Sequence, residues 1–186
     1  MALVIGIAAG YLAGGRLHNL ERLTLTKPWL VLVALGLQLI AFTPLRAALP
    51  ESAPVILHFA SYGLLAWFVV LNRRHLGVSI AGIGLGLNLA AIAANDGYMP
   101  ASKAALDMAG MAYSGETLNN SAVIGAGTHV RFLGDVFATP SWMPAANVFS
   151  IGDVLIVAGI AVLLVASMRR MRTSAEAESP EPASGS

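Results

Sequence analysis

Five long apolar segments constrain this chain more than any other feature of its sequence. An α-helix needs about 20 mostly apolar residues to cross the hydrocarbon core of a bilayer. The chain is 56% hydrophobic and only 11% charged, whereas soluble domains carry about 25% charged residues. Too little polar surface is left to face water, so we expect lipid to be the main solvent. The predicted membrane helices are residues 2–20, 28–45, 54–71, 76–95 and 148–168.

The first segment is the shortest of the five. A secretory signal peptide has basic residues before its apolar stretch, and here the first positive charge, Arg16, follows it. We therefore interpret the segment as a retained helix, which Arg16 and His18 extend by reaching toward the interface.

The basic residues predict the orientation. Cytoplasmic connections carry an excess of Lys and Arg, and here alternate connections are basic. One side has Arg16, Arg22, Lys27, Arg73, Arg74, Arg169, Arg170 and Arg172; the other has only Arg46, Lys103 and Arg131. The sequence therefore predicts an all-α integral membrane protein of the plasma membrane, a five-helix bundle in one domain of residues 1–172, with the N-terminus outside and the C-terminus cytoplasmic.

The longest connection, residues 96–147, then lies outside the cell between the fourth and fifth helices. It contains several aromatic residues, which is unlike a disordered segment, and Ser102 can begin a short helix over residues 102–112. We expect the motifs at its two ends to form one structural unit, with Tyr98 and Met99 turning back onto the mouth of the bundle. The Ser-, Pro- and Glu-containing tail, residues 173–186, is predicted to be disordered and cytoplasmic.

Glycines repeat every four residues in two of the segments, as Gly6, Gly10 and Gly14 and as Gly82 and Gly86. Such faces let two helix backbones approach closely in lipid. We expect the first helix to pack against the fourth.

Polar side chains within the predicted helices gather toward the outer leaflet, where they predict a binding pocket beneath the long loop. Some of these side chains can instead have purely structural roles. Ser150 and Asp153 have the spacing of a helix capping box, and Gln38 and Asn88 are typical of hydrogen bonds between membrane helices. The candidate binding residues are Gln38, His58, Tyr62, Asn88, Asn95, Tyr98, Asn147, Ser150 and Asp153.

The common catalytic and nucleotide-binding motifs are absent from the sequence. The chain has no cysteine, and His58, His129, Asp96, Asp135 and Asp153 lack ligand-like spacing. We therefore assign no catalytic residue, metal or cofactor. The net charge of +1 favours no nucleic-acid partner; the expected partners are membrane lipids and an envelope lipid or protein.

Two motifs carry a resemblance that covers residues 1–168. Residues 95–102, NDGYMPAS, close the fourth helix, and residues 147–155, NVFSIGDVL, open the fifth. Together with residues 16–20, Gln38 and the loop segment 127–136, which contains Leu133-Gly134-Asp135, they resemble a family of small bacterial membrane proteins (domain of unknown function family 5317). That family more usually has Asn-Gly-Gly-Tyr-Met-Pro, so Asp96 is a weaker site candidate than Tyr98 or Pro100. The resemblance implies the inner membrane and supplies no activity.

A shorter likeness concerns residues 58–65. His58-Phe59 followed by Tyr62-Gly63 is similar to a helix of the VanZ-like family, which is linked to glycopeptide resistance and envelope stress.

From these patterns we expect an accessory or binding protein that holds a lipid or envelope-precursor group. The first alternative is a membrane enzyme acting on such a lipid, with His58 and Asp153 as acid and base. A transporter of ions or small solutes is the second, and it is less favoured because the inner halves of the helices are apolar.

Overall fold

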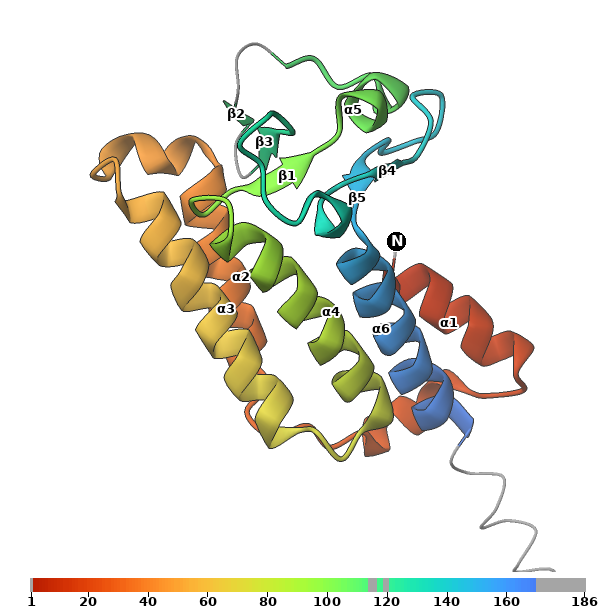
Figure 1. The fold of residues 1–186 in the computed structure, drawn as a ribbon. Helices are drawn as coiled ribbons and strands as arrows, with labels where there is room; N and C mark the ends of the chain where they lie inside the picture. The colour runs from red at the N-terminus through yellow and green to blue at the C-terminus, as the bar shows by residue number, and fades with distance from the viewer. Residues whose placement is uncertain (1, 114–116, 119–120, 170–186) are drawn as a thin grey trace, which may run out of the picture.

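The computed structural model describes residues 2–113, 117–118 and 121–169, which are mostly helical (Figure 1). Three of the described helices are long and apolar enough to cross a membrane, namely α3 (Ala53–Leu71), α4 (Leu76–Ala93) and α6 (Ile151–Arg169). At a rise of 1.5 Å per residue, each is about 27 Å long. Two shorter apolar helices accompany them, α1 (Ala2–Leu12) and α2 (Trp29–Phe42). The predicted tail, residues 173–186, lies outside the described residues.

The first two helices are shorter than the sequence predicts, for local reasons. The prediction of a helix through residue 20 is wrong, because Gly14 adopts a left-handed conformation (φ 75°) that ends a helix; the 3₁₀ helix η1 (Leu17–Arg22) follows. The second helix stops at Phe42 because Thr43 is extended before Pro44, as residues that precede proline usually are. A further 3₁₀ helix, η2 (Pro44–Ala48), leads to α3.

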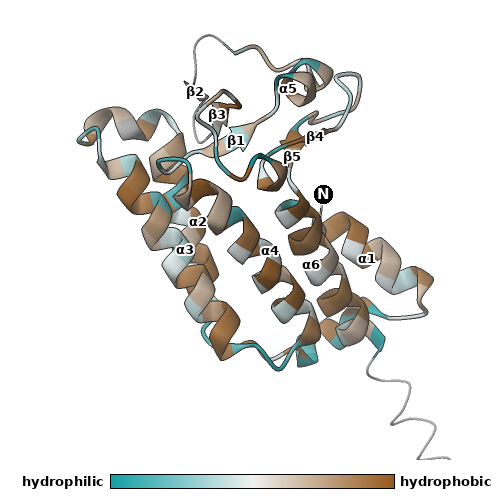
Figure 2. Ribbon diagram, viewed as in Figure 1, coloured by the Kyte–Doolittle hydropathy of each residue, from teal (hydrophilic) through white to brown (hydrophobic). Residues whose placement is uncertain are grey.

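The helices are neighbours in the order α1, α6, α4, α3, α2, and Figure 1 shows this arrangement. Hydropathy is high along the helices, and polar residues gather in the connections at the end away from the strands (Figure 2). Large apolar side chains such as Leu32 (70% exposed) and Leu39 (61%) cover the exterior, which is compatible with a lipid-facing surface. The structure does not confirm a closed bundle of five helices.

Glycines lie at the contacts of α6 with α1 and with α4, which are not the contacts that we expect from the sequence. Gly6 and Gly10 of α1 face Leu164 and Met168 of α6, so the prediction that the first helix packs on the fourth is wrong. The face of α4 that packs closely is also different: it presents Gly77 and Gly84 to Gly159 and Gly152 of α6. Gly86 has open space around its Cα, and Gly82 faces Val69 of α3.

The long connection folds into a cap, which comprises residues 96–113, 117–118 and 121–149. One sheet has the order β1-β3-β2, with β1 (Met99–Ala101) parallel and β2 (Thr117–Leu118) antiparallel to β3 (Ser121–Val123). A second sheet pairs β4 (Phe137–Ala138) with β5 (Val148–Phe149). The short helix α5 (Lys103–Ala109) and the 3₁₀ turn η3 (Arg131–Leu133) complete the cap.

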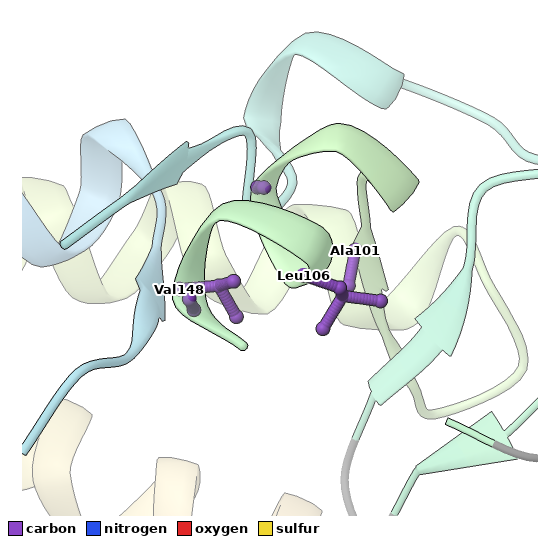
Figure 3. Close-up of a cluster of buried hydrophobic side chains, with 5 residues drawn as sticks. Ala101, Leu106 and Val148 are labelled. Carbon is purple, nitrogen blue, oxygen red and sulfur yellow. The ribbon is translucent and has the colours of Figure 1, made fainter. Parts of the chain in front are cut away.

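Two apolar clusters stabilise the cap. In the first, α5, β1 and β5 bury Ala101, Leu106 and Val148 against one another (Figure 3). The second joins the cap to the helices, because Met99 packs with Tyr62 of α3 and with Ala91 and Ile92 of α4. The cap is therefore attached to α3 and α4 by buried apolar contacts.

Candidate functional site

The capping box at the start of α6 is present. The Ser150 backbone N–H donates to Asp153 Oδ2 (2.9 Å), and the Asp153 N–H donates to Ser150 Oγ (3.0 Å). The Ser150 hydroxyl also lies 2.9 Å from Asp153 Oδ2. Two backbone donors that have no partner within the helix are thus satisfied reciprocally. This local pattern explains why the chain re-enters a helix at Ile151.

A second helix contributes to this hydrogen-bond network. Asn88 of α4 donates from Nδ2 to Asp153 Oδ1 (2.9 Å), and its Oδ1 accepts from Ser150 Oγ (2.8 Å). The contact is possible because Gly152 and Gly84 let the two backbones meet; a methyl group at Gly152 would collide with Asn88 Oδ1. The network Asn88–Ser150–Asp153 therefore fixes the cap ends of α4 and α6 relative to each other.

Asp135 of the cap lies in the same region. Its backbone N–H donates to the Pro100 carbonyl (2.7 Å), and its carbonyl accepts from Ser102 (3.0 Å), which holds the residue beside β1. The residue is only 8% exposed, and no donor among the described residues forms a hydrogen bond with its carboxyl group. Burial, and next the negative charge of Asp153, raise the pKa of Asp135 to about 7. The carboxyl group therefore changes charge near neutral pH.

Tyr62 completes the polar side of the site from α3. It is buried next to Met99, and the charges of both Asp153 and Asp135 act on its hydroxyl group. Side chains from α3, α4, α6 and the cap thus come within electrostatic reach of one another under the cap.

A cavity of about 740 Å³ opens beside these side chains. Asp135 and Asp153 line it together with apolar residues of the cap and of α6. Its volume is within the range of small-molecule sites, and mostly apolar walls with a few polar groups are typical of them. The other lining residues are Leu106, Met111, Ser121, Thr139, Met143, Pro144, Ala145, Asn147, Val148, Phe149, Val154 and Val157. We refer to this space as the cap cavity.

The wall of the cap cavity that α6 forms belongs to a helix face that is packed against α1 further along the helix. Val154, Val157, Ala161, Leu164 and Met168 follow one another at intervals of three and four residues, so they lie on one face of α6. Along the second half of this face α1 covers Ala161, Leu164 and Met168. Along the first half, Val154 and Val157 line the cavity instead.

Of the nine residues proposed from the sequence, Asn88, Ser150 and Asp153 are hydrogen-bonded to one another at this site. Tyr62 lies within electrostatic reach of Asp153, and Asn147 lines the same cavity as Asp153. Asn147 is exposed, and its backbone N–H and carbonyl pair with Thr139. The structure thus places Asn147 at the rim of the cap cavity.

Gln38 and His58 lie elsewhere, at the contact between α2 and α3. Gln38 Nε2 donates to Ser61 Oγ (3.0 Å), and Ser61 Oγ donates to the His58 carbonyl (2.6 Å). The His58 ring packs against Phe42 and Tyr62, with ring centroids 4.7 and 5.2 Å apart. These contacts connect two helices, which is the usual role of such polar groups in lipid.

Tyr98 does turn back toward α3. It is half-buried and lines a separate space of about 380 Å³ with His58, Glu51 and Pro54. Asp96 and Gly97 before it both have positive φ, 55° and 90°. Asp tolerates this left-handed conformation better than most residues do, because its short polar side chain can hydrogen-bond locally.

Asn95 has a structural role within the cap. Its side chain donates to the carbonyls of Ala91 (2.7 Å) and His129 (3.0 Å) and accepts from the His129 N–H (2.8 Å). It thereby ties the end of α4 to a loop more than thirty residues away in sequence.

The site residue that the sequence reasoning leaves out is Asp135. The only signal for it is its place in Leu133-Gly134-Asp135, within the loop that carries the family resemblance. No local pattern shows that a bridge between Ala101 and Asp135 buries it beside Asp153.

Within the described residues, no three His, Cys, Asp or Glu side chains are grouped closely enough to hold a metal ion. The arrangement under the cap can instead accept hydrogen bonds, pair with a cation or exchange a proton, because it presents two carboxyl groups.

No curated protein and no solved structure matches the chain. The comparisons do not show the likeness of residues 58–65 to the VanZ-like family, which stays a prediction. The model of a family described as Family of unknown function (DUF5317) matches residues 22–165, more than three quarters of the sequence. The chain belongs to this family.

Proposed function

We propose that the protein is an accessory or binding protein that holds a lipid, or the lipid part of an envelope precursor, in the cap cavity. The observation that carries the proposal is the position of Val154 and Val157. They belong to the α6 face that α1 covers further along, yet they line a cavity instead of packing on a helix. An acyl chain beside α6 would give this face the apolar partner that α1 gives its second half.

The proposed topology places this cavity at the outer leaflet. The basic connections alternate along the chain, and the cap lies at the opposite end of α3, α4 and α6 from Arg73 and Arg74. We propose five crossings with the N-terminus outside, although α1 and α2 are shorter than the hydrocarbon core. Reporter fusions after Arg74 and after Arg172 test this: both should report cytoplasm, and a periplasmic signal at residue 74 would overturn it.

Native mass spectrometry of the purified protein tests lipid binding. Val154→Trp adds an indole to the wall of the cavity and should remove the bound lipid, because the indole occupies the space proposed for an acyl chain. Leu32→Trp adds the same group at an exposed position of α2 and should leave the bound lipid unchanged. Equal lipid occupancy in the two variants would contradict the proposal.

A second candidate is a membrane enzyme that acts on the bound lipid. One observation favours it: Asp135, whose pKa burial raises to about 7, lines the same cavity as Asp153, and a carboxyl group that titrates near neutral pH can donate or accept a proton. His58 is not part of this pair, because it lines a different space. Incubating the purified protein with its co-purified lipid distinguishes the two functions, since an enzyme changes the lipid mass and Asp153→Asn stops the change. An accessory protein leaves the lipid mass constant.

A further inference from the structure

We infer that the lipid held in the cap cavity carries a primary ammonium group, which pairs with the carboxylates of Asp135 and Asp153. This inference rests on the proposed function, because it names the chemistry of the headgroup in the same cavity.

Asp135 is the acidic group of the cavity that has no partner for its carboxyl oxygens among the described residues. The residue is more than nine-tenths buried, its side chain lines the cavity, and no described residue donates a hydrogen bond to its carboxyl group. A buried carboxylate without partners is costly, so the group must be neutral or must receive a cation or donor from outside. Asp153 differs, because Asn88 and Ser150 already donate to its two oxygens.

The charged side chains that line the cap cavity are all acidic among the described residues. Its described lining residues include two Asp and no Lys, Arg or His. Headgroups whose only charge is a phosphate would be repelled by the two carboxyl groups and would meet no positive side chain. A primary ammonium has three donors and a positive charge, so one group can satisfy Asp135 and also attract Asp153. The phosphate of such a lipid can remain near the rim, where the exposed Asn147 offers an amide.

The space on the other side of Tyr62, next to His58, does not offer the same combination of groups. The space of about 380 Å³ beside His58 and Tyr98 contains one carboxylate, Glu51, which is exposed to solvent. It lacks the apolar wall of α6 residues that an acyl chain requires. Only the cap cavity therefore combines, among the described spaces, an unpaired buried carboxyl group with an apolar wall on a membrane-length helix.

The affinity for an ammonium lipid should then depend on pH. The titratable groups that face Asp135 are Asp153 of α6 and Tyr62 of α3. Because the pKa of the empty site is about 7, acidification to pH 5 protonates Asp135 and removes its attraction for a cation. The ammonium group and the lipid phosphate keep their charges over this range.

The test is a competition between phosphatidylethanolamine and phosphatidylglycerol with identical acyl chains, added in equal amounts to the delipidated protein at pH 8 and read by native mass spectrometry. We expect phosphatidylethanolamine to be enriched roughly tenfold, the effect of one charge-assisted hydrogen bond. Asp135→Asn should abolish the enrichment. The matched control is Asp107→Asn, which removes an exposed carboxylate of α5 outside the cavity and should preserve it.

If Asp135→Asn does not fold, the wild-type protein at pH 5 replaces it and should show the same loss. Equal binding of the two lipids at pH 8, or enrichment that survives both Asp135→Asn and pH 5, overturns the headgroup inference. The underlying lipid site fails separately: it is excluded if Val154→Trp binds as much lipid as the wild type. Equal binding of both lipids together with loss in Val154→Trp would leave the site in place and reject only the ammonium headgroup.

Discussion

The two halves of one face of α6 have the same spacing and different surroundings. In the second half, Leu164 (9% exposed) and Met168 (fully buried) are covered by α1, whose Gly6 and Gly10 allow close approach. In the first half, Val154 is 41% exposed and lines the cap cavity with Val157. Periodicity alone thus defines an apolar face without saying what covers it. In this chain one half of the face packs against a helix, and the other half lines a cavity.

The packed half should be the more sensitive to added volume. A Cβ at Gly15 would lie 2.6 Å from Met168 Cβ and 2.9 Å from the Gly10 carbonyl oxygen, so Gly15→Val forces backbone movement. We expect a loss of about 3 kcal/mol, the upper end for overpacking, seen as a lower Tm in detergent. Gly86→Val is the control, because nothing lies within 4 Å of its added Cβ. An equal Tm for the two variants would show that α1 does not depend on this contact.

The cavity half should instead be sensitive to pH. The folded-state pKa of Asp135 is about 7, above the ordinary value of 3.8. Between about pH 4 and pH 7 the unfolded carboxyl group has lost its proton while the folded one keeps it. Stability therefore falls as pH rises through this window and stays low above it.

Asp135→Asn removes this penalty. In lipid-free detergent it should stabilise the protein by on the order of 2 kcal/mol at pH 8 and have little effect near pH 4. Thermal unfolding of both proteins across this range measures the difference. A wild-type protein as stable as the variant at pH 8 would mean that Asp135 has a partner or water that keeps it charged.

Substitution in the capping box at the start of α6 should have a smaller effect on stability. Ser150→Ala removes the hydroxyl that accepts from the Asp153 N–H and donates to Asn88, at an expected cost of about 1 to 2 kcal/mol. Ser102 occupies the corresponding position before α5 but makes no side-chain capping bond, so Ser102→Ala should change Tm much less. The reverse ranking would show that the capping box does not set the start of α6.

The features that could be predicted from the sequence are those that depend on local pattern. The three membrane-length helices follow from runs of apolar residues, and the capping box follows from the spacing of Ser150 and Asp153. The ends of α1 at Leu12 and of α2 at Phe42 also have local causes, since Gly14 and Pro44 follow them. These signals are easily missed because each lies within a long run of apolar residues.

The features that could not be predicted depend on partners distant in sequence. A glycine face shows that close packing is available but does not specify a partner, so Gly6 and Gly10 face α6 instead of α4. The cap strands contain two or three residues each, too few to give a period. Asp135 becomes a site residue only because its loop pairs with Ala101, which places it beside a carboxylate from another element.

The smallest expected effect tests the comparison most directly. Val154→Leu adds one methylene group toward the cap cavity, where there is room for it. The free energy of unfolding should therefore change by less than about 0.5 kcal/mol. Ala161→Val enlarges a residue on the same face by two methyl groups, opposite Gly6, whose added Cβ would lie 3.2 Å from the Ala161 Cα. This second variant should lose about 1 kcal/mol or more, because α1 leaves no room there. Thermal unfolding of the wild type and the two variants in one detergent compares the two losses of stability. If Val154→Leu is the more damaging of the two, the first half of the face is as tightly packed as the second, and no ligand is needed to explain it.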